Sequence, residues 1–172
     1  MSSNYMKNIL EKVVVNVGVG KLSSQPNFDE KILPEIIKEL SLITGQKSAT
    51  RMAKQSIAGF KLRAGTAVGL KTTLRKKRMV EFLAKLINVA FPRVRDFRGI
   101  KKNSVDLNGN LTIGLKEHLV FPEVTPETSK INFGLEVTLI PKIRNKEKAM
   151  ELYKELRIPF STEGRSVSGG KK

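Results

Sequence analysis

The chain has 172 residues, of which 40% are apolar and 28% charged, a composition typical of a globular protein with a sizeable core. Lys and Arg total 32 against 16 Asp and Glu, so the formal net charge is +16. The lack of cysteine excludes disulfides, thiolate metal sites and a cysteine nucleophile and fits a reducing cytosol. No run approaches the ~20 apolar residues of a membrane span.

The positive charge is concentrated in the middle third of the chain. Residues 47–102 hold sixteen basic and only two acidic side chains. Such a concentration costs stability through repulsion unless a polyanion neutralises it, and nucleic acid is the default polyanion. A solvated surface usually mixes both signs, and a membrane-binding helix needs aromatic anchors that a chain with no Trp offers poorly. We therefore expect a nucleic-acid partner and no membrane.

Hydrophobic periodicity predicts the elements of the first half of the chain. In chain order they are a Val-rich strand at 10–17, a helix at 27–44, a short strand at 48–52, a basic loop at 55–65, a strand at 66–75 and a helix at 76–91. Pro34 is expected to kink the first helix or mark its effective start, and Gly45 to stop it. Pro92 is expected to end the second helix.

The second half of the chain predicts a hairpin, a strand and a helix. The hairpin joins residues 104–106 to 111–115 through the tight-turn pair Asn108-Gly109, a strand follows at 134–140 and a helix at 145–156. The interspersed elements predict an α+β fold, a two-layer, largely antiparallel sheet with helices on one face and the other face open for a partner, which the charge indicates to be nucleic acid. We expect one RNA-binding domain over residues 1–160 and a disordered basic tail over 161–172.

Residues 15–21, VNVGVGK, resemble a phosphate-binding loop without matching a nucleotide-binding one. Glycines let backbone N–H groups approach an anion closely, and Lys21 adds charge. A Walker loop requires Gly where Val15 stands, and a dinucleotide fingerprint requires Gly where Ser23 stands. We expect Gly18 and Gly20 to meet other phosphates, with a purely structural turn as an equal alternative.

The sequence nominates no reaction. His118 is the only histidine, which makes a His-based metal site unavailable and a structural or surface role the better interpretation. Glu117 and Glu123 do not form an obvious carboxylate pair, and no nucleophile elbow or kinase motif occurs. We therefore expect no enzyme, no cofactor and no metal.

Three basic motifs favour nucleic acid. Lys71, Thr73 and Arg75 share one face of a strand, and a hydroxyl between two cations suits sugar and phosphate oxygens. LITGQK places Gln46 and Lys47 just past a helix end. PRVRDFRG, residues 92–99, gathers Arg93, Arg95 and Arg98 around Phe97 for phosphate contact and base stacking, with Asp96 expected to order the arginines by ion pairing.

These motifs, in their order along the chain, resemble the bacterial-type ribosomal protein L-five family, which binds 5S rRNA. The resemblance is carried by NVGVGK, LITGQK, SIAGFKLRAG, TLRKKRMVEFL, LINVAFPRVRDFRGI, LNGNLTIGLKEHLVFPE and RIPF, between residues 10 and 160. It implies a structural constituent of the large subunit in the central protuberance of a cytoplasmic ribosome, with an organellar ribosome as the alternative. We expect the family's N-terminal basic helix to be largely absent, because only residues 1–9 precede the predicted first strand.

The resemblance also implies site residues and partners. The 5S rRNA face comprises Asn16, Gly18, Gly20, Gln46, Lys47, Lys71, Thr73 and Arg75. A basic loop facing P-site tRNA and the small-subunit head comprises Lys54, Ser56, Phe60, Lys61 and Arg63, and ribosomal RNA backbone is held by Arg93, Arg95 and Arg98. Further partners are large-subunit rRNA, neighbouring large-subunit proteins and small-subunit head protein thirteen. The less favoured alternatives are a nucleotide-using or RNA-modifying enzyme and a membrane-associated or chaperone-like basic module.

Overall fold

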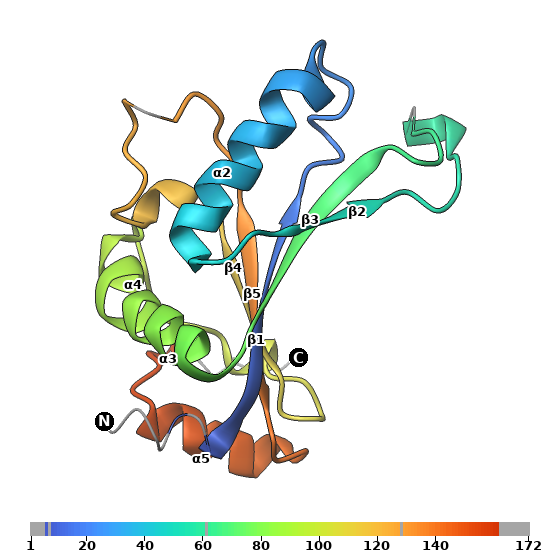
Figure 1. Ribbon diagram of the computed structural model, residues 1–172. Helices are drawn as coiled ribbons and strands as arrows, with labels where there is room; N and C mark the ends of the chain where they lie inside the picture. Colours follow the sequence, from blue (N-terminus) through green and yellow to red (C-terminus); the bar gives the residue numbers. More distant parts are fainter. Residues whose placement is uncertain (1–5, 7, 61, 128, 162–172) are drawn as a thin grey trace, which may run out of the picture.

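Five strands form one antiparallel sheet in the order β2-β3-β1-β5-β4 (Figure 1). Their bounds are β1 Leu10–Gly18, β2 Ala49–Met52, β3 Ala67–Leu74, β4 Leu111–Leu115 and β5 Leu135–Pro141. The structure is a computed structural model that describes residues 6, 8–60, 62–127 and 129–161. The expected tail beyond residue 161 and most of the segment before β1 lie outside these residues.

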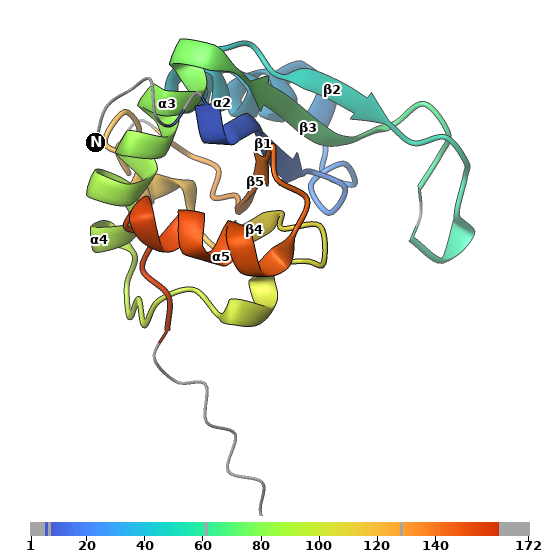
Figure 2. The same cartoon turned by 90° about the horizontal axis from the view of Figure 1, so that it is seen from below.

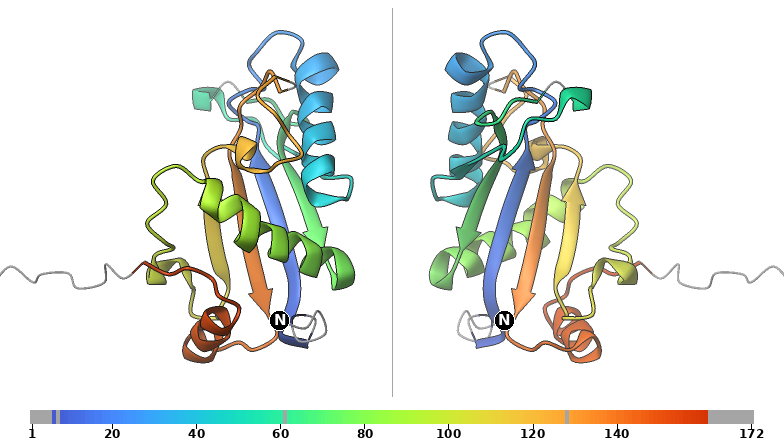
Figure 3. Two further views of the ribbon diagram at one scale, coloured as in Figure 1. Left: turned by 90° about the vertical axis from the view of Figure 1, so that its left-hand side faces the viewer. Right: turned by 90° about the vertical axis from the view of Figure 1, so that its right-hand side faces the viewer.

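The helices cover one face of the sheet and leave the other open, as the two views of Figure 3 show. The helices are α2 Leu33–Thr44, α3 Lys76–Lys85, the short α4 Phe91–Arg93 and α5 Lys146–Glu155. α2 and α3 lie against the covered face, and α5 lies at the end of the sheet (Figures 1 and 2). The predicted α+β architecture is confirmed.

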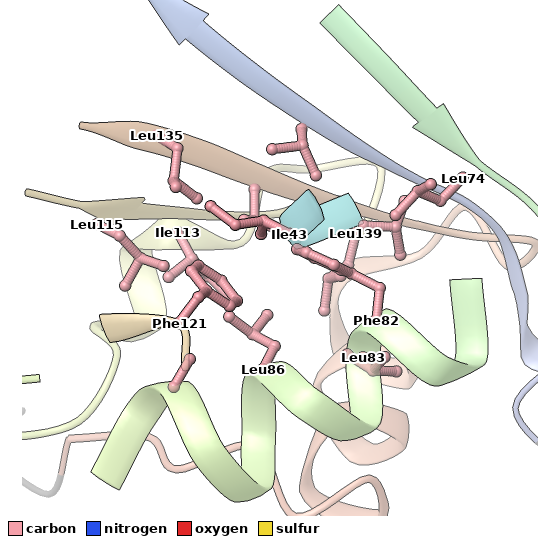
Figure 4. Packing of buried hydrophobic residues seen from close by; sticks show 14 of the residues in the cluster. Ile43, Leu74, Phe82, Leu83, Leu86, Ile113, Leu115, Phe121, Leu135 and Leu139 are labelled. Carbon is pink, nitrogen blue, oxygen red and sulfur yellow. The ribbon is translucent and has the colours of Figure 1, made fainter. Parts of the chain in front are cut away.

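Alternation along the strands separates the core from the open face. Val13, Val15 and Val17 of β1 are at most 2% exposed and point toward the helices. Their partners on the same side come from β3, β4, β5 and the helices, and include Ile43, Leu74, Phe82, Leu83, Leu86, Ile113, Leu115, Phe121, Leu135 and Leu139 (Figure 4). Burying this many apolar side chains is what holds the helical layer on the sheet.

Two of the predicted helices differ in detail from the sequence pattern. Residues Phe28–Ile32 form a π-helical turn, and Pro34 lies in the first turn of α2, where a missing N–H costs little. Gly45 closes α2 with φ of 66° and donates its N–H to the Ser41 carbonyl, as predicted. The second helix continues past α3 through a π turn, Leu86–Ala90, into α4, so Pro92 lies at the start of the last turn rather than after the helix.

The strand predicted at residues 104–106 is wrong, although the turn beside it is correct. Residues Lys102–Ser104 form a 3-10 turn, and Val105 makes only an isolated bridge to Leu111. Asp106 stabilises the turn from within. Its carboxylate accepts hydrogen bonds from the backbone and side-chain N–H groups of Asn110 at 2.8 and 2.7 Å. β4 forms its ladder with β5, the next strand along the chain, and meets the segment before the turn only through the single bridge of Val105.

The single histidine is a structural residue of the core. His118 is fully buried and stacks on Phe133 with ring centroids 3.9 Å apart. Its Nε2 lies 3.1 Å from Oε2 of the buried Glu39 of α2 and 3.0 Å from the hydroxyl of Ser129. Burial lowers the pKa of His118, against the opposing pull of the Glu39 carboxylate.

We expect this histidine to make folding pH-dependent. Its pKa in the folded chain lies below the ordinary 6.5, so the unfolded chain binds the proton first as the pH falls. The free energy of unfolding should therefore fall between about pH 7 and pH 5, and His118→Gln should lose that part of the decrease. Denaturant titrations of both proteins at the two pH values measure it, and an identical pH dependence would contradict the assignment.

Candidate nucleic-acid interface

The strand register arranges the open face in two central rows of side chains. The first row runs across four strands as Thr73, Val14, Thr138 and Thr112. The second, which we call the central row, runs across all five strands as Ala49, Lys71, Asn16, Glu136 and Gly114. The face is thus lined by hydroxyl, amide and charged groups around a valine, which is a surface suited to a polar partner.

Gln46 is held between β3 and α3 by two hydrogen bonds. Its side-chain amide donates to the Thr73 carbonyl at 3.2 Å, and its carbonyl oxygen accepts from Arg78 of α3 at 3.2 Å. The turn after α2 delivers it there, since the Thr44 hydroxyl donates to the Gln46 backbone carbonyl at 2.9 Å. The structure therefore brings Gln46 and Thr73 together, and it adds Arg78, which the motif analysis left out of the site.

Asn16 and Lys71 are paired across β1 and β3, one row from Thr73. Both are half-buried, whereas Lys47 after α2 is exposed. The predicted group of Asn16, Lys71 and Thr73 is thus assembled on one face by the register.

Arg75 lies just beyond β3, at the start of α3, and extends the face toward the first residues of β1. Its guanidinium lies 3.6 Å from the Glu11 carboxylate, which Lys12 also approaches at 3.0 Å. The hydrogen bond and charge of Lys12, followed by those of Arg75, lower the pKa of Glu11. Lys12, which the motif analysis did not select, therefore joins Arg75 at this corner.

The backbone conformation does not require glycine at positions 18 and 20. Neither has the positive φ that Gly45, Gly65, Gly99 and Gly109 show. A Cβ added at Gly18 would meet nothing within 4 Å, and one at Gly20 only the Val68 carbonyl at 3.9 Å. Both are exposed, so what they provide is bare backbone beside the open face.

The predicted basic loop is a hairpin that extends β2 and β3 away from the body, residues 53–66, here called the arm (Figures 1 and 2). Ala53 and its partners Thr66 and Gly65 continue the ladder with bonds of 2.8 and 2.9 Å, and Ile57 bridges Leu62. Lys54 and Arg63 are exposed on it, while Ser56 accepts the Ala64 N–H at 2.9 Å and so shapes the arm itself. Phe60 belongs to a 3-10 turn, Ala58–Phe60, and Lys61 lies outside the described residues.

The predicted arginine cluster lies beyond the opposite edge of the sheet. Arg93 ends α4, and Arg95 and Arg98 follow in a loop over residues 93–101, here called the arginine loop. The loop and β4 border a groove of about 1030 Å³. The structure thus places the three arginines in one loop beside β4, at the edge of the sheet away from Gln46 and Thr73.

The arginine loop is ordered by apolar packing more than by Asp96. Arg95 and Asp96 are 97% and 88% exposed and 4.0 Å apart, a geometry that contributes little. Phe97 stacks on Phe91 with centroids 5.1 Å apart, so one ring face is already covered. Ile100 then hydrogen-bonds the chain at Pro159 and Ser161. The expected ion pair of Asp96 with Arg95 is present, but water competes for both charges, so the pair contributes little to the order of the loop.

Among the described residues, no helix has the length and apolar content of a membrane span. Within the same residues, no group of three or more His, Asp or Glu side chains is placed to hold a metal ion.

Two family descriptions match nearly the whole chain. The family described as "Ribosomal protein L5" matches residues 4–63, and the description of that ribosomal family's C-terminus matches residues 67–160. A large ribosomal subunit protein uL5 from Halothermothrix orenii is 45% identical over 152 residues, covering 88% of this chain and 83% of the relative. Those of Malacoplasma penetrans and Helicobacter pylori are 48% and 45% identical, covering 88% of this chain and 79% and 82% of their own lengths.

The fold, the charge and these matches define a ribosomal protein, a structural constituent of the large subunit rather than an enzyme. More narrowly, the chain belongs to the ribosomal protein L5 family, of the bacterial type, and its place is the cytoplasmic ribosome. The resemblance seen in the ordered motifs is confirmed.

Two alanine substitutions test whether glycine at position 18 is needed for stability. Gly18→Ala should change the free energy of unfolding by no more than about 0.5 kcal/mol, because the added methyl enters open space. Gly99→Ala should cost about 1–3 kcal/mol, because φ is +89° and the methyl would lie 2.6 Å from the Ser161 nitrogen. Denaturant titration compares the two variants. A large loss in the free energy of unfolding of Gly18→Ala would show that this glycine has a structural role.

Proposed function

We propose that this chain binds 5S rRNA through the open sheet face, in the central protuberance of the large subunit. The observation that carries the proposal is the central row with the Thr73 row beside it, a polar face that no described helix covers. Hydroxyl and amide groups beside Lys71 suit sugar and phosphate oxygens, and Lys47 and Arg75 add charge at its margin. The exposed backbone at Gly18 and Gly20 lets RNA approach closely.

In the same proposal, the arm and the arginine loop bind other partners. The arm, with Lys54, Ser56, Phe60, Lys61 and Arg63, lies near P-site tRNA and near small-subunit head protein thirteen. The exposed Arg93, Arg95 and Arg98 hold large-subunit rRNA backbone, next to neighbouring large-subunit proteins. Loops that project from a rigid scaffold are a common way to reach several partners from one fold.

Filter binding to 5S rRNA and to a scrambled RNA of the same length tests the proposal. Wild-type protein should bind 5S rRNA more tightly, and the preference should persist at moderate salt, where purely electrostatic binding weakens. Equal affinity for both RNAs at each salt concentration would refute a 5S-specific face.

Lys71→Gln should weaken 5S binding and reduce the slope of log K against log salt by about 1, because one phosphate contact is lost. Lys154→Gln removes an exposed lysine from α5 and should leave both quantities unchanged. If the two variants have the same 5S affinity and the same salt slope, the proposed RNA-binding face is refuted.

Neutralising the arm should separate tRNA contact from 5S binding. Lys54→Gln combined with Arg63→Gln should leave 5S affinity of the free protein unchanged, because the arm extends away from the open face. Ribosomes reconstituted with this variant should hold P-site tRNA about twofold to tenfold more weakly, as expected for one or two lost charge contacts. Normal tRNA affinity in the double variant would argue against a tRNA-facing arm.

A further inference from the structure

An exposed carboxylate lies in the middle of the polar open face. Glu136 of β5 is the direct neighbour of Asn16 on β1 and of Gly114 on β4. No side-chain hydrogen bond or ion pair joins Glu136 or Asn16 to another residue that the structure describes. A carboxylate repels a phosphate backbone, so what Glu136 can take from a bound RNA is a hydrogen bond from a base or a ribose hydroxyl.

Glu136 completes an ordered set of three polar groups on adjacent strands. Lys71, Asn16 and Glu136 follow one another across β3, β1 and β5, offering a cationic donor, an amide and a pure acceptor. Adjacent strands are about 4.8 Å apart, so the three groups together span roughly the width of one nucleotide base with its phosphate.

The space around this set is open to a flat ligand. Ala49 and Gly114 end the central row, and the next row along the strands pairs Gly18 with Gly69. A Cβ added at Gly114 or Gly18 would meet no atom within 4 Å. Small residues thus surround the amide and the carboxylate on two sides and leave their polar atoms accessible.

We propose that Asn16 and Glu136 read one guanine of the bound RNA, an inference that rests on the proposed function. The two carboxylate oxygens of Glu136 accept from guanine N1–H and N2–H, and the Asn16 side-chain amide donates to O6. Guanine alone among the bases presents two neighbouring donors beside an acceptor on its Watson–Crick edge, and unpaired loop bases expose that edge. Lys71 neutralises a phosphate beside it.

Replacing the carboxylate by an amide distinguishes base recognition from simple electrostatics, because the two predict opposite changes in the affinity for RNA. Glu136→Gln in the full chain should weaken 5S rRNA binding about tenfold or more while leaving the salt slope unchanged. A face that recognises only phosphates would instead bind more tightly once the negative charge is removed. Tighter or unchanged binding by Glu136→Gln therefore overturns the guanine site. Glu151→Gln, an exposed carboxylate of α5, is the matched control and should bind as wild type does.

The RNA side of the contact is tested with inosine, which lacks the N2 amino group of guanine. Among 5S rRNAs carrying one inosine within the region that the protein protects from cleavage, one should bind wild-type protein more weakly. Glu136→Gln should weaken the binding of that RNA less than the binding of unmodified RNA, because only the N1–H contact to residue 136 remains to be altered. If every inosine RNA binds wild-type protein as the unmodified RNA does, the guanine site is refuted while 5S binding stands. If wild-type protein does not prefer 5S rRNA over the scrambled RNA, the proposed function and this site fall together.

Discussion

The double pairing of β1 is the constraint on which the rest of the structure depends. β1 lies between β3 and β5 and is antiparallel to both, so its register determines which side chains of three strands share a face. With Val13, Val15 and Val17 facing the helices, Asn16 necessarily faces outward beside Lys71 and Glu136. A slip of one residue would exchange the two faces, so the core and the interface are two consequences of one register.

The same pairing joins the two halves of the family into one sheet. The matches to the two family descriptions meet between residues 63 and 67, in the arm. β1 and β2 lie in the first match, whereas β3, β4 and β5 lie in the second. Neither half contains the sheet by itself, because the strands of the second half meet β1 on both sides.

The helical layer contributes to the interface through a few polar links at its edges. Gln46 ties the end of α2 to β3 and Arg78, and Lys85 of α3 donates to the Ile43 carbonyl at 2.6 Å and pairs with Glu123. These contacts hold the turn after α2 against the sheet, where Gln46 and Lys47 border the open face. The arm continues from the ends of β2 and β3, and the arginine loop lies beside β4, so the two segments can reach separate partners.

The α+β class, the positions of most helices and strands, the turn at Gly109 and the ribosomal family could all be predicted from the sequence. These depend on local periodicity, on turn chemistry and on motifs contiguous in the chain. The folded arrangement was needed to show that β4 pairs with β5, that His118 meets Glu39 in the core, and that Glu136 stands beside Asn16. Period-two alternation tells which residues of one strand share a face, but not which strand lies next to it. That choice depends on burying all five strands together, and it joins residues as distant in the chain as Asn16 and Glu136.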